Sequence, residues 1–481
     1  MSAVRQTTTG DTQRLREFYD RAAAARERWM QRNEFYYQDD HRYMKFLVPQ
    51  GLRVLELGCG TGHLLASLRP SHGVGVDISQ GMIDAARAAH PTLEFHVGDM
   101  EDPDLLEKLG GPFDAIVISD AVGHMRDCQR TFEQLHSVCT PDTRIIVAYF
   151  SQLWRPVLKL AELTGQKMPV PAQNWLAPED VEALMELAEF EPIKREWRLL
   201  LPKRLGGLGP LINSTIGTLP LVRRLSLRHY VVARPARHLD RGDLSATVVV
   251  PCRNEAGNVE PAVERIPQFS SDLEILFVEG NSSDDTVQRI HQIIADHPDR
   301  KIRFTQQTGR GKGDAVRKGF AEATGDVLMI LDADLTVPPE DLPKFFEVIR
   351  SGKADYVQGT RLVYPMESNA MRPLNLAGNH AFARIFTWLL NQRITDTLCG
   401  TKVLLKRDYD RLVANRSYFG DFDPFGDFDL IFGASKLNLK ILELPVRYAE
   451  RTYGTTQISR FRDGILLLRM VVFAFRKLKA V

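Results

Sequence analysis

Two aspartates one residue apart follow a strongly apolar stretch of this sequence. Residues 327–331 read VLMIL, and Asp332, Ala333 and Asp334 come next. Successive side chains of a strand point to opposite faces, so carboxylates at positions i and i+2 share one face and reach the same ligand. Hard divalent cations such as Mg²⁺ and Mn²⁺ prefer carboxylate oxygens. The pattern predicts a strand end that holds a metal, although Asp-x-Asp on its own is more often a solvated strand end.

A glycine-rich loop near the N-terminus points to a second kind of chemistry. Residues 54–62 read VLELGCGTG, an apolar strand followed by a loop that opens a helix. Glycines let a ligand approach the backbone closely, and the amino end of a helix favours a negatively charged group. The next apolar stretches end in Asp77 and Asp99. The first acid is placed to accept hydrogen bonds from ribose hydroxyls, and the second is placed to accept one from an adenine amino group.

Strands that alternate with helices must position these two patterns. The alternation starts at Arg53 and starts again at Ser245, which predicts two mostly parallel sheets. Ligands of such sheets bind at the carboxyl ends of the strands, where both patterns fall. The polar stretch ARPARHLDRGD has no apolar period and is typical of a linker. We therefore expect an α/β protein with two doubly wound domains, residues 1–237 and 244–481, joined by a linker at 238–243.

The composition is that of a folded globular protein. The 481 residues are 44% hydrophobic and 26% charged, with a formal net charge of +1. This balance gives no reason to expect a nucleic-acid partner. The five cysteines are scattered without paired ligand spacing, which disfavours disulfides and a zinc site and favours the cytoplasm. No apolar run reaches the roughly 18 residues that cross a bilayer.

The C-terminal tail combines positive charge with apolar residues. Arg462, Arg469 and Arg476 recur every seven residues in a run rich in Ile, Leu, Val and Phe, so they form one stripe of a helix. Such a helix suits a membrane surface with anionic headgroups. Packing on the domain or on a second copy of the chain is an equal alternative. The expected location is the cytoplasm, with peripheral contact to the cytoplasmic face of a membrane under the first alternative.

The order of the N-terminal motifs resembles that of class I S-adenosylmethionine-dependent methyltransferases over roughly residues 15–237. This resemblance implies a Rossmann-like sheet and S-adenosyl-L-methionine as cofactor. It assigns cofactor contacts to Glu56, Gly58, Gly60, Gly62, Asp77, Asp99, Met100 and Asp120. His124 lies where the family's fourth strand faces the transferred methyl group. It is a candidate general base for a hydroxyl acceptor, or a histidine that packs locally.

The second half resembles the inverting family 2 glycosyltransferases with a GT-A fold over about residues 244–481. The likeness rests on VVVPCRNEAGNV, FVEGNSSDDT, GRGKGDAVRKGF and the ILDAD stretch. Downstream, TDTLCGTKVLLKRD, GDFDLIFGASKLNLKILELPVRY and RTYGTTQISR are similar to dolichyl- and polyprenyl-phosphate sugar transferases. The resemblance implies a nucleotide-sugar donor, Mg²⁺ or Mn²⁺, and a polyprenyl-phosphate acceptor.

The matching positions imply a role for each residue. Asp332 and Asp334 would hold the metal and the diphosphate at the catalytic centre. Donor and phosphate contacts would come from Pro251, Asn254, Glu255, Glu279, Asp284, Lys312, Arg361, Arg447 and Arg451. Asp396, Asp427 and Asp429 would line the acceptor side. A phosphate acceptor is already ionised and needs no general base, whereas a hydroxyl acceptor would need Asp427 or Asp429 as that base.

Two positions depart from the family pattern. Gly280 replaces the second acid of a pair and bears on recognition of the base, whereas Gln457 replaces a lysine and bears on the lipid phosphate. Arg460 and Arg462 offer replacement cations. The expected function is a bifunctional enzyme of glycan or glycolipid synthesis. The alternatives are a saccharide or protein hydroxyl as sugar acceptor, and a methyltransferase domain that only binds S-adenosylmethionine or serves as a scaffold.

Overall fold

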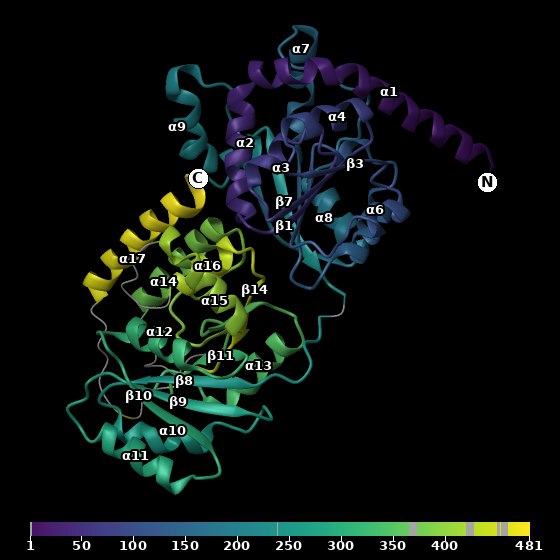
Figure 1. Cartoon of the computed structure of the whole chain (residues 1–481). Helices are drawn as coiled ribbons and strands as arrows, with labels where there is room; N and C mark the ends of the chain where they lie inside the picture. The colour runs from purple at the N-terminus through teal and green to yellow at the C-terminus, as the bar shows by residue number, and fades with distance from the viewer. Residues whose placement is uncertain (1, 238, 365–372, 420–427, 450–452, 454–459) are drawn as a thin grey trace. The chain divides into compact units, whose positions relative to one another are not determined.

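The structure, a computed structural model, describes all residues except 1, 238, 365–372, 420–427, 450–452 and 454–459 (Figure 1). The chain divides into two compact units, Met1–His238 with Lys479–Val481, and Leu239–Leu478. Each unit contains one seven-stranded sheet with helices packed against it. The prediction of an α/β protein with two mostly parallel sheets is confirmed.

The first sheet has the strand order β3-β2-β1-β4-β5-β7-β6. Its strands are β1 (Arg53–Leu57), β2 (His72–Asp77), β3 (Glu94–Val97), β4 (Ala115–Ser119), β5 (Arg144–Phe150), β6 (Phe190–Arg198) and β7 (Arg228–Pro235). Strands β1 to β5 pair in parallel, and β7 runs antiparallel to both of its neighbours. The chain leaves β1 toward β2 and later returns to β4 on the other side, so a crevice opens beyond the carboxyl ends of β1 and β4.

The helices of the first unit cover this sheet and its carboxyl edge. They are α1 (Ser2–Arg32), α2 (Glu34–Leu47), α3 (His63–Leu68), α4 (Gln80–Ala89), α5 (Pro103–Glu107), α6 (Cys128–Gln134), α7 (Arg155–Leu163), α8 (Pro178–Leu187) and α9 (Leu208–Ser214). Helix α1 is fixed to the start of α4, because Asp20 Oδ1 accepts from Ser79 Oγ at 2.6 Å and from the Gly81 N–H at 3.0 Å.

The second sheet has the order β10-β9-β8-β11-β13-β12-β14. Its strands are β8 (Ala246–Cys252), β9 (Leu273–Glu279), β10 (Lys301–Gln306), β11 (Val327–Ile330), β12 (Tyr356–Thr360), β13 (Lys402–Leu405) and β14 (Ile441–Pro445). Only β13, among these strands, runs antiparallel to its neighbours. The switch point of this sheet lies between β8 and β11, where the chain order reverses.

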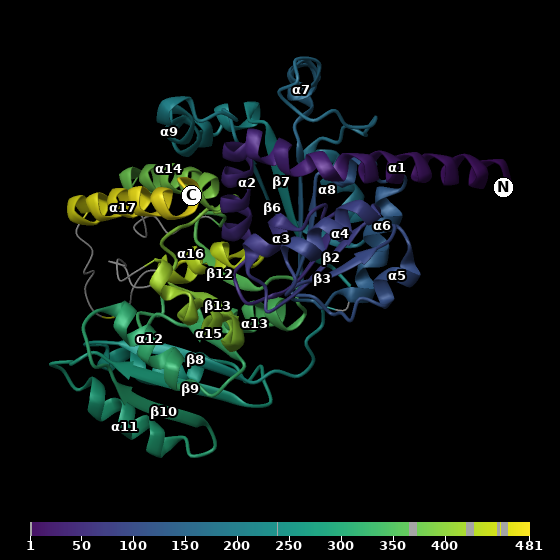
Figure 2. The ribbon, with the colours of Figure 1, turned by 45° about the horizontal axis from the view of Figure 1, so that its top comes forward.

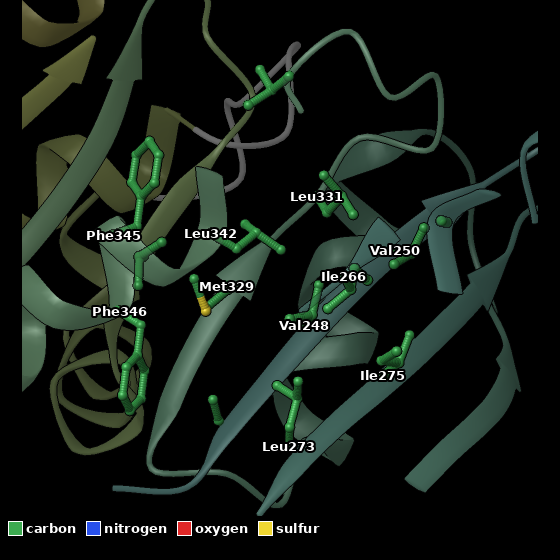
Figure 3. Close-up of a cluster of buried hydrophobic side chains, with 14 of the residues drawn as sticks. Val248, Val250, Ile266, Leu273, Ile275, Met329, Leu331, Leu342, Phe345 and Phe346 are labelled. Atoms are coloured by element: carbon green, nitrogen blue, oxygen red, sulfur yellow. The ribbon is translucent and has the colours of Figure 1, made fainter. Parts of the chain in front are cut away.

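The core of the second unit forms where α13 (Leu342–Arg350) packs on the sheet. Met329 of β11, Val248 of β8 and Phe345 of this helix are fully buried in one cluster (Figure 3). Ile349 of the same helix belongs to this cluster as well. The other helices are α10 (Val259–Arg265), α11 (Thr286–Asp296), α12 (Lys312–Glu322), α14 (Pro373–Leu390), α15 (Lys406–Ala414), α16 (Phe428–Lys436) and α17 (Arg460–Ala474).

The basic tail forms α17, which is apolar on two sides. Leu467 and Met470 are buried, and α17 contacts α14, whereas Ile465, Leu468 and Val472 are exposed. The helix therefore packs on its own unit and still presents an apolar stripe to solvent. Within the described residues, no helix combines the length and the hydropathy needed to cross a membrane. Contact of this stripe with a membrane surface stays a prediction.

The segment predicted to be a linker is fixed to the second unit. Arg241 Nη2 lies 2.8 Å from Asp355 Oδ1, and its Nη1 donates to the carbonyl of Ala354 at 3.1 Å. A Cβ on Gly352, whose φ is +68°, would lie only 2.2 Å from the carbonyl oxygen of Leu239. The polar composition of residues 239–243 thus reflects charges that are paired on this unit.

Candidate active sites

The glycine-rich loop of the first unit needs its glycines for conformation and for packing. Gly58, Gly60 and Gly62 have φ values of +75°, +51° and +76°. A Cβ on Gly58 would lie 2.5 Å from Ala121 Cβ, and one on Gly62 would lie 2.7 Å from the ring of Phe95. A Cβ on Gly60 would meet nothing within 4 Å. This last glycine leaves the backbone accessible to a ligand.

A cavity of about 540 Å³ borders this loop. The expected cofactor residues that line it are Glu56, Gly58, Gly60, Asp77, Met100 and Asp120, and His124 lines it as well. Gly62 and Asp99 are not among the lining residues. Asp99 instead accepts a 2.7 Å hydrogen bond from Arg126. The cofactor roles of all these residues stay predictions.

Asp77 is held in place by two backbone donors. Its Oδ2 accepts from the Gly60 N–H at 2.8 Å, and its Oδ1 accepts from the Ser79 N–H at 3.0 Å. Burial raises the pKa of Asp77 above its ordinary value, against these two hydrogen bonds, which favour the charged form. Each carboxylate oxygen keeps a second lone pair. Asp77 therefore has the acceptor capacity that a ribose diol requires.

Glu56 has a different environment, although it is also a buried acid beside the loop. Its Oε2 accepts from the Leu65 N–H at 3.0 Å and so caps the first turn of α3. Burial raises the pKa of Glu56 well above its ordinary value. Glu56 therefore shapes the start of the helix that follows the glycine loop.

A buried arginine that sequence reasoning missed organises one wall of the cavity. Arg228, at the start of β7, is fully buried; its Nη1 lies 2.6 Å from Asp120 Oδ1 and its Nε lies 2.9 Å from Asp40 Oδ1. The guanidinium also lies 5.4 Å from the ring centroid of Phe150. Buried charge is tolerated when it is paired in this way. The signal available in the sequence was an arginine that opens the apolar stretch HYVVARP.

His124 is held by an aromatic residue of the N-terminal helix. Its Nε2 lies 2.9 Å from the hydroxyl of Tyr19. Burial lowers the pKa of His124, which favours the neutral imidazole. Burial raises the pKa of Tyr19, so its hydroxyl stays protonated. Together with Tyr36 and Tyr37, Tyr19 brings α1 and α2 into the wall of the cavity.

The two neighbouring aspartates of the second unit lie just beyond β11. The strand ends at Ile330, so Asp332 and Asp334 lie in the turn that follows it. The prediction that they share one face of a strand is therefore wrong. Asp332 Oδ1 lies 2.6 Å from Nζ of Lys312, and Lys312 is the first residue of α12. Asp334 Oδ1 accepts from the hydroxyl of Thr336 at 2.8 Å. The acids therefore share the carboxyl edge of the sheet with a helix start.

Gly400, in the loop before the antiparallel strand β13, lies against this site. A Cβ on Gly400 would lie 1.9 Å from Asp332 Oδ2 and 2.5 Å from Lys312 Nζ. Only a glycine lets the backbone of the loop before β13 approach these two charged groups so closely. Gly400 lies in the stretch TDTLCGTKVLLKRD, which carries part of the resemblance, but the sequence did not identify it as a site residue.

Arg361 and Asp396 form a buried pair, although both were expected to contact substrates. Arg361 donates to Asp396 from Nε at 2.7 Å and from Nη2 at 2.8 Å. Asn379 Nδ2 donates to the same carboxylate at 3.2 Å. Burial raises the pKa of Asp396, but the hydrogen bonds and charge of Arg361 outweigh this effect and hold the pKa below its ordinary value. We therefore revise the role of Asp396 from lining the acceptor side to positioning Arg361.

The loops after β8 and β9 hold one another through short hydrogen bonds. Asn254 Oδ1 accepts from the Ser283 N–H at 2.7 Å, and the Glu255 N–H donates to Thr286 Oγ1 at 2.9 Å. Asp284 Oδ2 accepts from the Ala256 N–H at 3.3 Å. These contacts hold Asn254, Glu255 and Asp284 close together just after β8, and their contacts with a donor stay predictions.

The remaining expected residues are more dispersed or lie outside the described residues. Glu279, at the end of β9, is buried and accepts from the Ser282 N–H. Asp429 pairs with Arg416. The guanidinium of Arg447 lies 5.3 Å from the ring centroid of Tyr364. Asp427, Arg451 and Gln457 lie outside the described residues.

A divalent cation fits the donor set of the second unit. The described residues contain no group of three or more His, Cys, Asp and Glu side chains that would hold a metal alone. Mg²⁺ is commonly bound through one or two carboxylates together with substrate phosphates. Asp332 and Asp334, beside a lysine and a helix start, match this arrangement.

Comparison with known proteins gives a family for each unit. Residues 14–195 match the family described as "Methyltransferase domain", and residues 247–413 match "Glycosyl transferase family 2". The chain is a fusion of a methyltransferase domain and a family 2 glycosyltransferase domain. The resemblance stated from the sequence motifs is thereby confirmed.

Individual relatives match parts of this fusion protein. A dolichol-phosphate mannosyltransferase of Pyrococcus furiosus is 37% identical over 122 residues, 25% of this chain and 34% of its own. A dolichyl-phosphate hexose transferase of Haloferax volcanii is 29% identical over 216 residues, 45% of this chain and 86% of its own. The crystal structure of a methyltransferase of Thermotoga maritima covers 46% of this chain and 99% of its own, with 18% identity and a TM-score of 0.36. The matched part of this chain spans 34–51% of the length of four curated glycosyltransferase relatives, which include the Pyrococcus furiosus enzyme.

We predict that Asp396→Asn destabilises the glycosyltransferase unit, because it leaves the buried Arg361 without its counter-charge. The free energy of unfolding should fall by about 3 kcal/mol at pH 7. Because the folded-state pKa of Asp396 lies below its ordinary value, its stabilising effect is present at pH values above the unfolded-state pKa and is lost as the pH falls through the folded-state pKa. Denaturant unfolding should therefore show a difference in the free energy of unfolding between wild type and Asp396→Asn. This difference should be nearly constant down to about pH 4 and should become smaller below that pH.

Asp272→Asn is the matched control for this measurement. Asp272 pairs with Lys301 at 3.0 Å, and both side chains are exposed. Its loss should cost under about 1 kcal/mol. Equal effects of the two substitutions would contradict a stabilising role for the buried pair.

Proposed function

We propose that the glycosyltransferase unit moves a sugar from a nucleotide-sugar to a polyprenyl-phosphate acceptor. The observation that carries the proposal is the grouping of Asp332, Lys312 and Gly400 at the carboxyl edge of the second sheet. A diphosphate brings clustered negative charge, which such an edge can neutralise. The names of the relatives, dolichol-phosphate mannosyltransferase and dolichyl-phosphate hexose transferase, favour a polyprenyl phosphate as acceptor.

Each charged group would have a distinct task in this reaction. Asp332 and Asp334 would hold a divalent cation, which when bound supplies neutralisation of the departing diphosphate. Lys312 adds a positive charge 2.6 Å from Asp332. Arg361, fixed by Asp396, would present a rigid guanidinium to a phosphate group. An acceptor phosphate oxygen would bond to the anomeric carbon as the bond to the diphosphate breaks, with inversion.

A hydroxyl acceptor is the second candidate, and it makes a stronger demand on the protein. A hydroxyl must lose its proton, so a carboxylate must serve as base. Asp429, the described candidate, is held by Arg416. The hydroxyl alternative therefore depends on Asp427, outside the described residues, whereas the phosphate alternative needs no base.

We further propose that the methyltransferase unit binds S-adenosylmethionine in its cavity and methylates a substrate of the same glycan or glycolipid pathway. The glycine loop and Asp77 would hold the cofactor, which when bound supplies an electrophilic methyl group. His124, oriented by Tyr19, would take the proton of the acceptor. The alternative is a unit that binds the cofactor without turnover. Transfer of radiolabelled methyl to an extracted acceptor distinguishes the two.

We predict that Asp334→Asn strongly lowers the rate of sugar transfer and leaves the affinity for S-adenosylmethionine unchanged. Loss of one ligand to the metal and diphosphate should lower the transfer rate by about 100-fold or more. Asp326→Asn is the matched control, because Asp326 is an exposed acid next to the other end of β11. Wild-type transfer by Asp334→Asn, or loss of S-adenosylmethionine binding as well, would refute the assignment.

We predict that Asp77→Asn weakens binding of S-adenosylmethionine by about 100-fold, because an amide replaces a charged acceptor of two ribose hydrogen bonds. Isothermal titration calorimetry measures the change directly. Asp84→Asn, an exposed acid on α4, should bind like wild type. An affinity of Asp77→Asn equal to that of wild type would exclude the ribose contact.

A further inference from the structure

An exposed apolar surface lies on the methyltransferase unit, in two segments. Between Leu205 and Leu225, seven leucine and isoleucine side chains are 44–81% exposed. On α7, Val157, Leu160 and Leu163 are exposed as well. Surface helices normally turn their apolar stripe inward, and exposed leucines that occur singly need no explanation. A grouped set of this kind marks an interaction surface. We call the exposed apolar residues of 153–163 and 205–225 the leucine face.

The two segments of the leucine face are joined to one another. The indole of Trp154, just before α7, donates to the carbonyl of Leu225 at 2.8 Å. Beneath them, Leu158 of α7 forms a small buried cluster with Leu199 and Leu227. Figures 1 and 2 show α7 and α9 projecting from the same end of the first sheet. The exposed side chains therefore belong to one region of this unit.

Basic residues dominate the charge around the leucine face, and Glu162, an acid within its first segment, pairs with Lys159 and Lys167. From Trp197 to His238 the sequence has eight arginines and lysines and no aspartate or glutamate. Lys203, Arg204 and Arg224 among them are exposed. Apolar side chains flanked by basic ones suit a bilayer surface with anionic headgroups. A second copy of the chain suits it less, because a twofold contact would bring basic residues against basic residues.

The cavity of the methyltransferase unit reaches this face. Val157 and Leu160, two exposed members of the leucine face, also line the cavity. Pro202 and Lys203, which precede its second segment, line it as well. A molecule held at the leucine face is therefore next to the opening of the cavity that contains Asp77 and His124.

We propose that the methyltransferase unit docks on an anionic lipid bilayer through the leucine face, and that its methyl acceptor is an amphiphile taken from that bilayer. The apolar rim of the cavity would contact the hydrocarbon part of the acceptor, and the polar wall would receive its nucleophilic group. The assignment of an amphiphilic methyl acceptor rests on the proposed methyl transfer. The docking on a bilayer does not depend on that proposed activity.

The test is partition of the full-length chain onto vesicles, measured by flotation. Vesicles of phosphatidylcholine and phosphatidylglycerol in equal parts are compared with phosphatidylcholine alone. The double variant Leu208→Asp/Leu221→Asp should lower the partition coefficient on the anionic vesicles by about tenfold or more. Leu187→Asp is the matched control, because Leu187 is exposed on α8 of the same unit and should leave partition unchanged. Wild type should bind neutral vesicles about tenfold more weakly.

The measurement is repeated in an Ile465→Asp/Leu468→Asp background, so that binding through α17 does not mask the loss. Partition of the Leu208→Asp/Leu221→Asp variant equal to that of wild type in this background would overturn the docking proposal. A second result would also overturn it: light scattering shows that the wild type is a dimer and that the Leu208→Asp/Leu221→Asp variant is a monomer, and neither protein binds vesicles. Calorimetry with S-adenosylmethionine tests the docking and the acceptor assignment separately. A chain that docks through the leucine face but binds no S-adenosylmethionine would overturn the acceptor assignment and leave the docking proposal standing.

Discussion

Each unit depends on a crevice at the carboxyl edge of its sheet, where the chain leaves two neighbouring parallel strands in opposite directions. In the first sheet the crevice lies beyond β1 and β4, and in the second it lies beyond β8 and β11. Backbone N–H groups and helix starts gather there and favour anions. The methyltransferase unit fills this position with Gly58 and Gly60, and the glycosyltransferase unit fills it with Asp332 and Lys312. Related topologies thus present different chemistry at corresponding places.

Charge pairing keeps both crevices in shape before any ligand binds. Arg228 is held between Asp40 and Asp120 in the first unit, and Arg361 is held by Asp396 in the second. Burying such groups is costly unless they are paired, so the pairs keep their side chains in single positions. A pre-positioned charge needs little reorganisation when a substrate arrives.

Local patterns made much of this architecture predictable. The alternation of strands and helices predicted both sheets, and the glycine loop and the Asp-x-Asp motif identified where their crevices lie. Arg228 was missed because its partner Asp40 lies far away in the sequence, in α2. Gly400 was missed because its approach to Asp332 depends on how β13 enters the sheet. Motifs of adjacent residues can be read from sequence, whereas pairings made by tertiary packing cannot.

We propose that this one chain carries a metal-assisted nucleotide-sugar site and a separate site for S-adenosylmethionine. Calorimetric titration of the full-length chain with a panel of nucleotide sugars, with and without Mn²⁺, tests it most directly. We expect a nucleotide sugar of the panel to bind about tenfold or more tightly with Mn²⁺. The affinity of the chain for this nucleotide sugar should be the same when S-adenosylmethionine is already bound. Failure of the whole panel to bind in either condition, or competition between the two ligands, would contradict the claim.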